Sequence, residues 1–505
     1  MRNASLGIVA FVTACSHSGA TPDASGIGSD ATNHDASFGD GGVPLPAAPH
    51  GLFMLNPQGR DIASTFLTAG GPGTPYIKGA TIQVHWSDLQ PSGPATFQLA
   101  AATTTTIDAW TAAGKQVNLV FQASNYNGGN FVPTWYARTL PISSATQASG
   151  SKTIAIALAT GVNAGQGGFL VDVDLTGSNP LLGAQSIQIA GTAALDGVYP
   201  IATISSDGKT VTATAPTAAT TAKSETNIGT VGNPMFSCTS NNVTVTLPVY
   251  WGPNFELAWE GVMDEVKTHL DGQFGYFRFG MGTGGENSPV KPLDTSCESE
   301  LEAVGFSSAP VPWTTYNVSA SSWETTVAPV WIAFQHDLIS YVASKQFATQ
   351  VMLSLSTIDY APGEIDYGTA DAVGPIATAA GLGIGNQGWR QSDGTTTTSG
   401  VCAADYCALF PAARGVVPLE LQTVLASDPD NTTMNPSTGD LSLMLPEALG
   451  RGAQIFELYA DDLSCAFDPA FDGDPNANPA YVTTYAGCTA HNFPAAIEAA
   501  AAALH

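Results

Sequence analysis

Short apolar segments recur along the chain, with longer amphipathic stretches between them. Eight such segments can be counted, at residues 51–56, 80–86, 116–124, 274–282, 349–356, 381–388, 416–422 and 453–459. The intervening stretches, such as 255–271 and 330–344, repeat apolar residues every three or four positions, which predicts helices. Alternation of buried strands with helices favours an α/β fold over a sandwich.

Eight strand–helix units are the number that closes a (β/α)8 TIM barrel. One stretch breaks the alternation, because residues 141–231 are rich in Thr, Ala, Val and Ile, with turn signals such as Asp207-Gly208. We therefore expect a β-rich domain inserted in the loop after strand three, with the barrel divided into 47–140 and 232–505. Such loops lie at the face where barrel active sites are built, so the insert either grips a substrate or acts as a spacer.

The first fifteen residues resemble a bacterial lipoprotein signal peptide. Arg2 precedes the apolar stretch LGIVAFV, and the small residues of VTAC lead into Cys15. The resemblance implies cleavage before Cys15 and lipidation of that cysteine, and hence an exported lipoprotein at the cell surface or in the periplasm. The apolar stretch is too short to span a bilayer. Residues 16–46 hold few large apolar side chains, which predicts a flexible tether.

Charge narrows the range of partners. The 505 residues include 15 Lys plus Arg against 42 Asp plus Glu, a formal net charge of −27. Binding to polyphosphate or to an anionic membrane surface requires clustered cations, so nucleic acid is excluded as a partner. We expect contact with the membrane only through the lipid at Cys15.

The cysteines favour disulfides over a metal site. Six remain after Cys15, an even number that suits an oxidising compartment. Six cysteines allow fifteen pairings, of which spacing favours Cys402–Cys407 and Cys465–Cys488, and Cys238–Cys297 follows by elimination. No C-x-x-C pair and no H-E-x-x-H motif occurs, so we expect neither a metal nor an organic cofactor.

The glycine-rich stretch RFGMGTGGENSPV, residues 278–290, contains a G-x-G-x-x-G pattern after a predicted strand. A dinucleotide site also needs a helix at the third glycine, which Pro289 and Pro292 prevent, and Glu286 occupies the place of the phosphates. The stretch therefore presents a glutamate directly after strand four. Glu420 in strand seven and Glu457 in strand eight interrupt apolar segments, where an unpaired charge would be costly.

The order of these glutamates resembles the clan of retaining TIM-barrel glycoside hydrolases. That clan carries an acid/base Glu after strand four and a nucleophile Glu on strand seven, which implies these roles for Glu286 and Glu420. Glu457 is an alternative for either role. The acid/base Glu of the clan usually follows an Asn, whereas Gly285 precedes Glu286 here and Asn287 follows it. The GTGGE form is instead similar to the acid strand of β-amylase-like barrels, which invert.

Aromatic loops support a carbohydrate ligand. The fragments VHWSDLQP, FVPTWY and LPVYWGPNF resemble the sugar platforms of these enzymes. We expect substrate contacts from residues near strand ends, namely Trp86, Asn125, Trp135, Tyr250, Trp251, Asn287, Trp389, Glu457 and Tyr459. Core packing is the alternative for the aromatic rings, and salt bridges inside the barrel are the alternative for the carboxylates.

The sequence thus predicts a glycosidase that cleaves a poly- or oligosaccharide by a two-carboxylate, retaining mechanism. A catalytically silent carbohydrate-binding or adhesin lipoprotein would share the same aromatic residues and is the alternative. An esterase or protease is disfavoured because the chain lacks G-x-S-x-G.

Overall fold

The computed structural model describes the residues within the following ranges: 49–55, 57, 62–94, 96–124, 131–159, 186–205, 209–240, 243–280, 282, 285–286, 300, 304, 311–312, 326–327, 329–355, 358–361, 364–366, 368–389, 406–423, 441–471 and 485–504. The signal peptide with Cys15 and the tether at 16–46 lie outside these residues, so both stay predictions.

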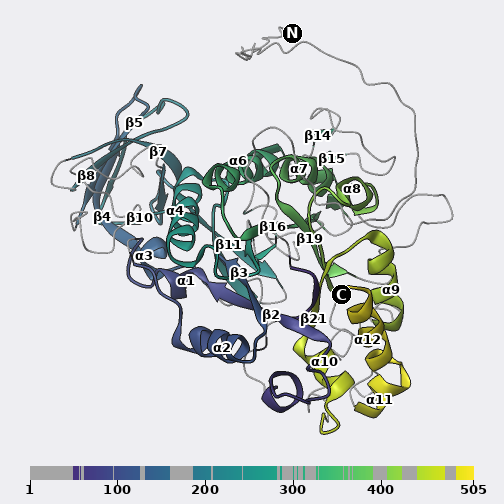
Figure 1. Cartoon of the computed structure of the whole chain (residues 1–505). Coiled ribbons are helices and arrows are strands. Elements are labelled where there is room, and N and C mark those ends of the chain that lie inside the picture. The colour runs from purple at the N-terminus through teal and green to yellow at the C-terminus, as the bar shows by residue number, and fades with distance from the viewer. Residues whose placement is uncertain are drawn as a thin grey trace. The chain divides into compact units, whose positions relative to one another are not determined.

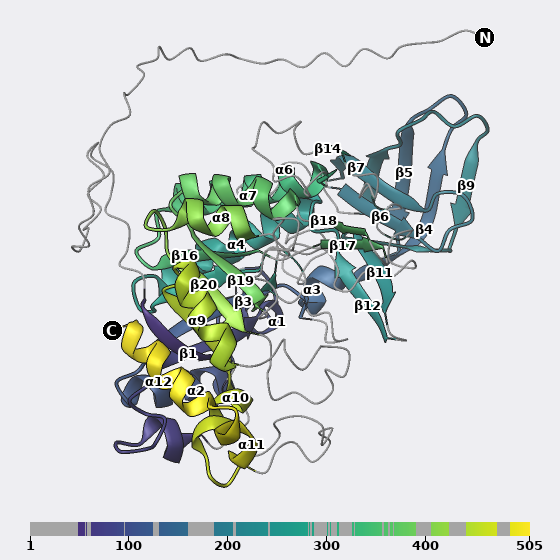
Figure 2. The same cartoon turned by 90° about the vertical axis from the view of Figure 1, so that its right-hand side faces the viewer.

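A closed barrel of eight parallel strands forms the centre of the fold (Figures 1 and 2). Its strands follow one another in chain order: β1 (Gly51–Leu55), β2 (Ile77–His85), β3 (Gln116–Gln122), β13 (Tyr276–Phe279), β16 (Gln350–Leu355), β19 (Gly383–Trp389), β20 (Leu419–Thr423) and β21 (Ile455–Tyr459). The pairing of β1 with β21 closes the ring. Each strand coincides with one of the eight apolar segments, so the closed parallel barrel predicted from the sequence is confirmed.

Helices follow the strands along the chain, as a β/α barrel requires. The π-helical turn η1 and the α-helices are η1 (Ala63–Leu67), α1 (Trp86–Leu89), α2 (Ala101–Ala112), α3 (Thr134–Ala137), α4 (Pro253–Leu270), α6 (Pro329–Lys345), α7 (Gly368–Ala379), α8 (Tyr406–Ala413), α9 (Leu441–Arg451), α10 (Ala460–Phe467), α11 (Tyr485–Ala490) and α12 (Phe493–Ala503). In α4, Phe255, Trp259, Val262 and Val266 recur at three- or four-residue spacing and are buried. The same spacing predicted this helix and α6.

Two kinds of core fill the barrel region. A large apolar cluster joins the outward-facing side chains of the strands to the helices. A much smaller cluster of Phe53, Tyr276, Met352 and Ile455 is separate from it. Phe53 and Ile455 share the register positions of Glu457 and Glu420, respectively, on neighbouring strands. Polar residues and this small cluster together therefore occupy the barrel interior.

Seven strands between β3 and α4 form a second sheet of their own. They are β4 (Thr139–Gln147), β5 (Thr153–Leu158), β6 (Ser186–Ala190), β7 (Gly197–Ile204), β8 (Thr210–Thr214), β9 (Lys223–Thr226) and β10 (Thr230–Gly232). The order is β10-β6-β7-β8-β5-β4-β9, and β10 also pairs with β4. Their apolar residues form a cluster separate from that of the barrel. We call this the inserted sheet; its standing as a domain with the boundaries 141–231 stays a prediction.

A group of buried amides ties the inserted sheet to helix α4. The side chain of Asn254 accepts from the Ser186 amide at 2.9 Å and donates to the Ser186 carbonyl at 2.8 Å. It also donates to the Asn233 side chain at 2.8 Å, and Asn233 in turn donates to the Tyr136 carbonyl in α3 at 2.8 Å. Both Asn254 and Asn233 are almost fully buried. This joint is therefore a set of paired polar groups rather than an apolar contact.

Smaller antiparallel pairs accompany the barrel strands. They are β11 (Met235–Ser240) with β12 (Val243–Pro248), β14 (Val311–Pro312) with β15 (Thr326–Val327), and β17 (Ile358–Ala361) with β18 (Glu364–Asp366). In the described part of the chain, no helix is long and apolar enough to cross a membrane.

One of the three expected disulfides is present in the structure. Cys465 in α10 and Cys488 in α11 are bonded, with their Cα atoms 5.8 Å apart. This confirms the pairing that spacing favours. Cys402 and Cys297 lie outside the described residues, as do the side chains of Cys407 and Cys238. The other two pairings therefore stay predictions.

Candidate functional site

Three charged side chains from different strands meet inside the barrel. Arg278 comes from β13, Glu420 from β20 and Glu457 from β21, and their exposed fractions are 1%, 0% and 0%. Nη1 of Arg278 lies 2.5 Å from Oε1 of Glu420 and 3.0 Å from Oε2 of Glu457. One guanidinium nitrogen thus binds both carboxyl groups. We refer to these three residues as the interior cluster.

Uncharged polar groups extend the interior cluster on both sides. The Tyr276 hydroxyl donates to Oε1 of Glu457 and shares a hydrogen bond of 3.0 Å with the Thr81 hydroxyl. On the other side, Nη2 of Arg278 donates to the Gln422 side chain at 3.3 Å, and Gln422 donates to the Tyr459 hydroxyl at 3.3 Å. A continuous chain of polar contacts therefore joins β2, β13, β20 and β21 through the barrel.

A glycine on the neighbouring strand makes room for Glu420. Gly385 in β19 is paired in register with Glu420. A methyl group on Gly385 would overlap with Oε2 of Glu420 and lie 3.0 Å from its Cδ. Oε2 of Glu420 has no hydrogen-bond partner among the described residues. The carboxyl group is therefore enclosed on this side by backbone rather than by a donor.

Burial and neighbouring charge shift the ionisation of the interior cluster. Burial, the adjacent Glu457 and a hydrogen bond between the two carboxyls raise the pKa of Glu420 well above its ordinary value, although Arg278 opposes this. Burial alone would lower the pKa of Arg278. Glu420 and Glu457 raise this pKa by more than burial lowers it, so the guanidinium stays charged. Burial and the nearby carboxylates also raise the pKa of the Tyr276 hydroxyl.

Glu286 lies where the chain turns back after β13. The Gly280 amide donates to the Phe121 carbonyl at 2.8 Å, next to the end of β3. Gly285 has a φ of 79° and lies so close to Gly280 and to the Gln122 side chain that any Cβ would crowd them. Glu286 follows directly and is 7% exposed. The glycines thus let this turn fold tightly against the C-terminal ends of β3 and β13, which is where barrel active sites lie.

Three of the expected sugar-binding aromatics belong to the core. Trp86, Trp135 and Tyr250 are at most 3% exposed and pack against other aromatic rings. The Trp86 and Trp135 indoles donate to the side chain and carbonyl of Gln90, at 2.8 and 2.7 Å. A ring covered on both faces offers no face to a sugar, so for these three residues the structure fits the alternative of core packing.

The remaining expected contacts differ in their surroundings. Trp251 is half-buried and donates to the Val304 carbonyl at 3.3 Å. Tyr459 is also half-buried and ends β21 at the C-terminal side of the barrel. Glu457 belongs to the interior cluster. Asn125, Asn287 and the side chain of Trp389 lie outside the described residues, so their roles stay predictions.

The site contains three residues that were not expected from the sequence, namely Arg278, Tyr276 and Gln422. A charged residue inside an apolar strand segment needs a partner, which is why Glu420 was expected to matter. Arg278 meets the same condition, because it is the one charged residue of the apolar segment FGYFRFGMG. A cation there predicts an interior partner of opposite charge. Tyr276 and Gln422 carry no comparable signal.

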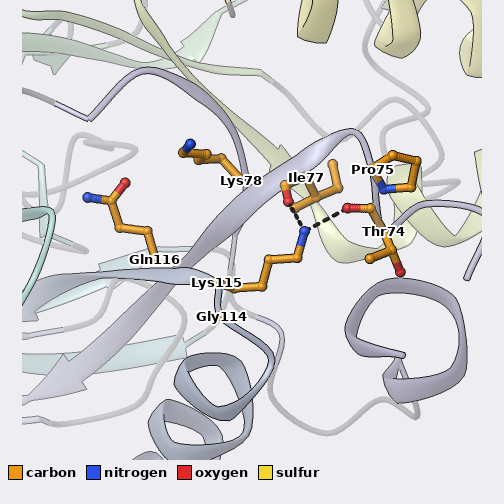
Figure 3. A pocket seen from close by; sticks show the side chains of 7 residues that line it. All are labelled: Thr74, Pro75, Ile77, Lys78, Gly114, Lys115 and Gln116. Atoms are coloured by element: carbon orange, nitrogen blue, oxygen red, sulfur yellow. Dashed lines mark hydrogen bonds between the residues drawn. The ribbon is translucent and has the colours of Figure 1, made fainter. Parts of the chain in front are cut away.

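A pocket of about 590 Å³ lies at the opposite end of the barrel strands (Figure 3). It is lined by Thr74, Pro75, Ile77, Lys78, Gly114, Lys115 and Gln116, around the first residues of β2 and β3. Nζ of Lys115 donates to the Thr74 and Ile77 carbonyls, each at 2.6 Å. These bonds fix the loop that leads into β2. None of these lining residues carries a carboxyl group, so the pocket is separate from Glu286 and from the interior cluster.

No group of His, Cys, Asp and Glu that could hold a metal ion is found in the part of the chain that the structure describes.

Comparison with solved structures gives distant likenesses. The catalytic domain of the β-amylase from Paenibacillus polymyxa is 10% identical, covers 82% of this chain and 92% of its own length, and has a TM-score of 0.39. The pyruvate kinase of Cryptosporidium parvum is 8% identical, covers 91% of this chain and 71% of its own, and has a TM-score of 0.29. At these identities and scores, neither likeness bears on what this chain does. No protein-family model and no curated protein sequence matches the chain.

Proposed function

We propose that this protein is a glycoside hydrolase in which Glu286 donates the proton and Glu420 is the second carboxylate. The observation that carries the proposal is the place of Glu286. It is a nearly buried carboxyl on a glycine turn at the C-terminal ends of β3 and β13. Barrel enzymes build their active sites at this end of the strands.

The chemistry needs two carboxyl groups with different tasks. Glu286 gives its proton to the glycosidic oxygen as the bond to the anomeric carbon breaks. In a retaining enzyme Glu420 attacks that carbon, and water later releases the sugar with Glu286 acting as base. Arg278, 2.5 Å from Oε1 of Glu420, supplies positive charge that would stabilise the ionised nucleophile. The mechanism requires no metal or organic cofactor.

The location we propose follows from the N-terminal sequence. A lipid on Cys15 and a tether at residues 16–46 would hold the barrel at the membrane surface of an exported protein. The substrate would then be a poly- or oligosaccharide outside the cytoplasm. The membrane would be contacted only through the anchor.

A second candidate function is recognition of a glycan without cleavage. Glu420 is the second residue of β20, so Gln422 lies nearer the C-terminal end of that strand. Its carboxyl is fully buried and already bound to Arg278. A carboxylate in this position stabilises the barrel interior, and sugar could bind at the C-terminal end without reaching it.

Hydrolysis by the purified protein distinguishes the two candidates. Release of reducing ends from a panel of polysaccharides and aryl glycosides is expected, and Glu286→Gln should reduce kcat about 10²–10⁴-fold. Because an activated aryl leaving group needs less proton donation, its hydrolysis should fall much less in this variant.

Glu447→Gln is the matched control, since Glu447 is a half-buried residue of α9 that pairs with Arg451 and lies outside the interior cluster. It should hydrolyse all substrates as the wild type does. Glycan binding with no hydrolysis by any form would instead establish the second candidate. Equal activity of the wild type and Glu286→Gln on every substrate would remove Glu286 from the mechanism.

A further inference from the structure

The interior cluster carries more negative than positive charge. Arg278 contributes one positive charge, and Glu420 and Glu457 would contribute two negative charges if both were ionised. All three side chains are shielded from solvent, with exposed fractions of 0–1%. An uncompensated charge in such a place is costly, and the usual remedy is to bind a proton.

The two carboxyl groups are also close neighbours. Oε1 of Glu420 and Oε2 of Glu457 bind the same nitrogen, Nη1 of Arg278, at 2.5 and 3.0 Å. Two carboxylates that share a site do not both ionise at ordinary pH, because each disfavours the charge of the other. The cluster therefore needs one proton to reach neutrality.

The hydrogen bonds differ between the two glutamates. Oε1 of Glu457 accepts from the Tyr276 hydroxyl and Oε2 from Arg278, so both of its oxygens have donors. Glu420 accepts from Arg278 through Oε1, whereas Oε2 has no partner among the described residues and faces Gly385. Donors stabilise the ionised form, so Glu457 is the better carboxylate and Glu420 the better acid.

We propose that Glu420 and Glu457 share one proton, which Glu420 carries in the resting protein. Glu457 is then a positioning residue that controls when Glu420 ionises. The effect on catalysis rests on the proposed function, whereas the shared proton is a property of the barrel itself.

Among the residues that the structure describes, few other groups around the pair can change its charge. From β13 it faces Arg278 and Tyr276, and Tyr459 in β21 reaches it through Gln422. On the neighbouring strand β19, Gly385 is paired with Glu420, and on β1, Phe53 is paired with Glu457. Neither residue titrates. Replacement of one carboxyl should therefore be felt mainly by the other.

Infrared spectroscopy of the carboxyl groups tests the shared proton without any substrate. The spectrum should be recorded near pH 8.5, above the pKa of Glu260, which burial and Glu256 raise to about 7. The wild type is expected to show the carbonyl band of one protonated carboxyl. Glu420→Gln should lose the band because the acid is gone. Glu457→Gln should also lose it, because Glu420 then ionises beside Arg278.

Glu447→Gln is again the control and should keep the band. A wild-type protein without the band would overturn the proposal, and so would a band that persists in Glu457→Gln. If Glu457→Gln does not fold, the wild-type spectrum still decides by the presence or absence of the band.

The pH profile of hydrolysis tests the role of Glu457 in catalysis. In Glu457→Gln the acid limb of kcat/KM should move to lower pH by about one unit or more, since Glu420 would ionise more readily. If Glu457→Gln loses the infrared band but the acid limb of its kcat/KM profile stays at the wild-type pH, Glu457 shares the proton but does not control the reaction. The band together with an absence of hydrolysis would confirm the shared proton and reject the proposed function.

Discussion

At the residue scale, Gly385 shows how a missing side chain serves a neighbouring strand. The Glu420 carboxyl occupies the space that a Cβ on Gly385 would need. Arg278 holds that carboxyl from the other side, so it cannot simply move away. The glycine is therefore required by the packing of the barrel interior rather than by its own backbone angles.

Gly385→Ala is expected to destabilise the protein by about 1–3 kcal/mol, because the added methyl group overpacks a filled interior. Urea unfolding at pH 7 measures the change.

Gly261→Ala is the matched control for Gly385→Ala. Gly261 lies inside α4, and a Cβ there would meet nothing within 4 Å. The control should stabilise the protein by about 0.5–1 kcal/mol through helix propensity. Equal effects of the two substitutions would show that the interior has room for the methyl group.

The residues of the interior cluster differ in how far the sequence reveals them. Glu420 and Glu457 stand out because a charge inside an apolar strand demands a reason, and Arg278 satisfies the same condition. Their meeting could not be predicted, since 142 positions separate Arg278 from Glu420. Likewise, no local pattern distinguishes a tryptophan in the core, such as Trp86, from one that binds sugar.

At the scale of elements, the barrel strands were predictable because both of their faces are buried. Such strands are continuous apolar segments in the sequence, and their order in a β/α barrel follows the chain. For the inserted sheet, no comparable rule relates the order of the strands in the sheet to their order along the chain. Its Thr- and Ala-rich strands pair in the order β10-β6-β7-β8-β5-β4-β9, which depends on contacts distant in sequence. The sequence therefore predicted strands there but not their arrangement.

The joint at Asn254 is expected to control the local stability of the inserted sheet. Asn254→Ala leaves the Ser186 amide, the Ser186 carbonyl and Asn233 without their partner. Each buried group left unpaired costs about 1–3 kcal/mol. Hydrogen exchange should therefore quicken in β6, while β2 on the barrel keeps its protection.

Gln273→Ala provides the comparison for Asn254→Ala. Gln273 is an exposed amide with one local bond, to the His269 carbonyl at 2.7 Å. Its loss should change the unfolding free energy by less than about 0.5 kcal/mol. Unchanged exchange in β6 of Asn254→Ala would mean that the amide joint does not hold the sheet.

At the scale of the whole molecule, carboxyl groups that keep their protons on folding make stability depend on pH. The pKa of Glu420 is raised well above the usual range, and that of Glu260 is raised to about 7 by burial and by Glu256. Unfolded glutamates ionise near pH 4.3, so folding binds protons above that pH. Stability from these groups is complete at low pH and is lost as the pH rises through their folded pKa values.

The free energy of unfolding should thus decrease from pH 5 to pH 8. One fully retained proton gives a slope of about 1.4 kcal/mol per pH unit, and the net charge of −27 adds repulsion in the same direction. Urea unfolding at intervals of one pH unit measures the slope. Glu260→Gln should flatten the part between pH 5 and pH 7, where the folded protein keeps this proton and the unfolded chain does not. A free energy that rises with pH over this range would contradict the prediction.

The ends of the inserted sheet have a consequence for how such a chain could arise. Thr139 opens its first strand and Gly232 closes its last, and these two residues are paired partners. Antiparallel partners lie only about 5 Å apart, a gap that a short peptide spans. The whole stretch could therefore have entered an ancestral barrel, or could be excised from this one, without moving the flanking ends of the loop.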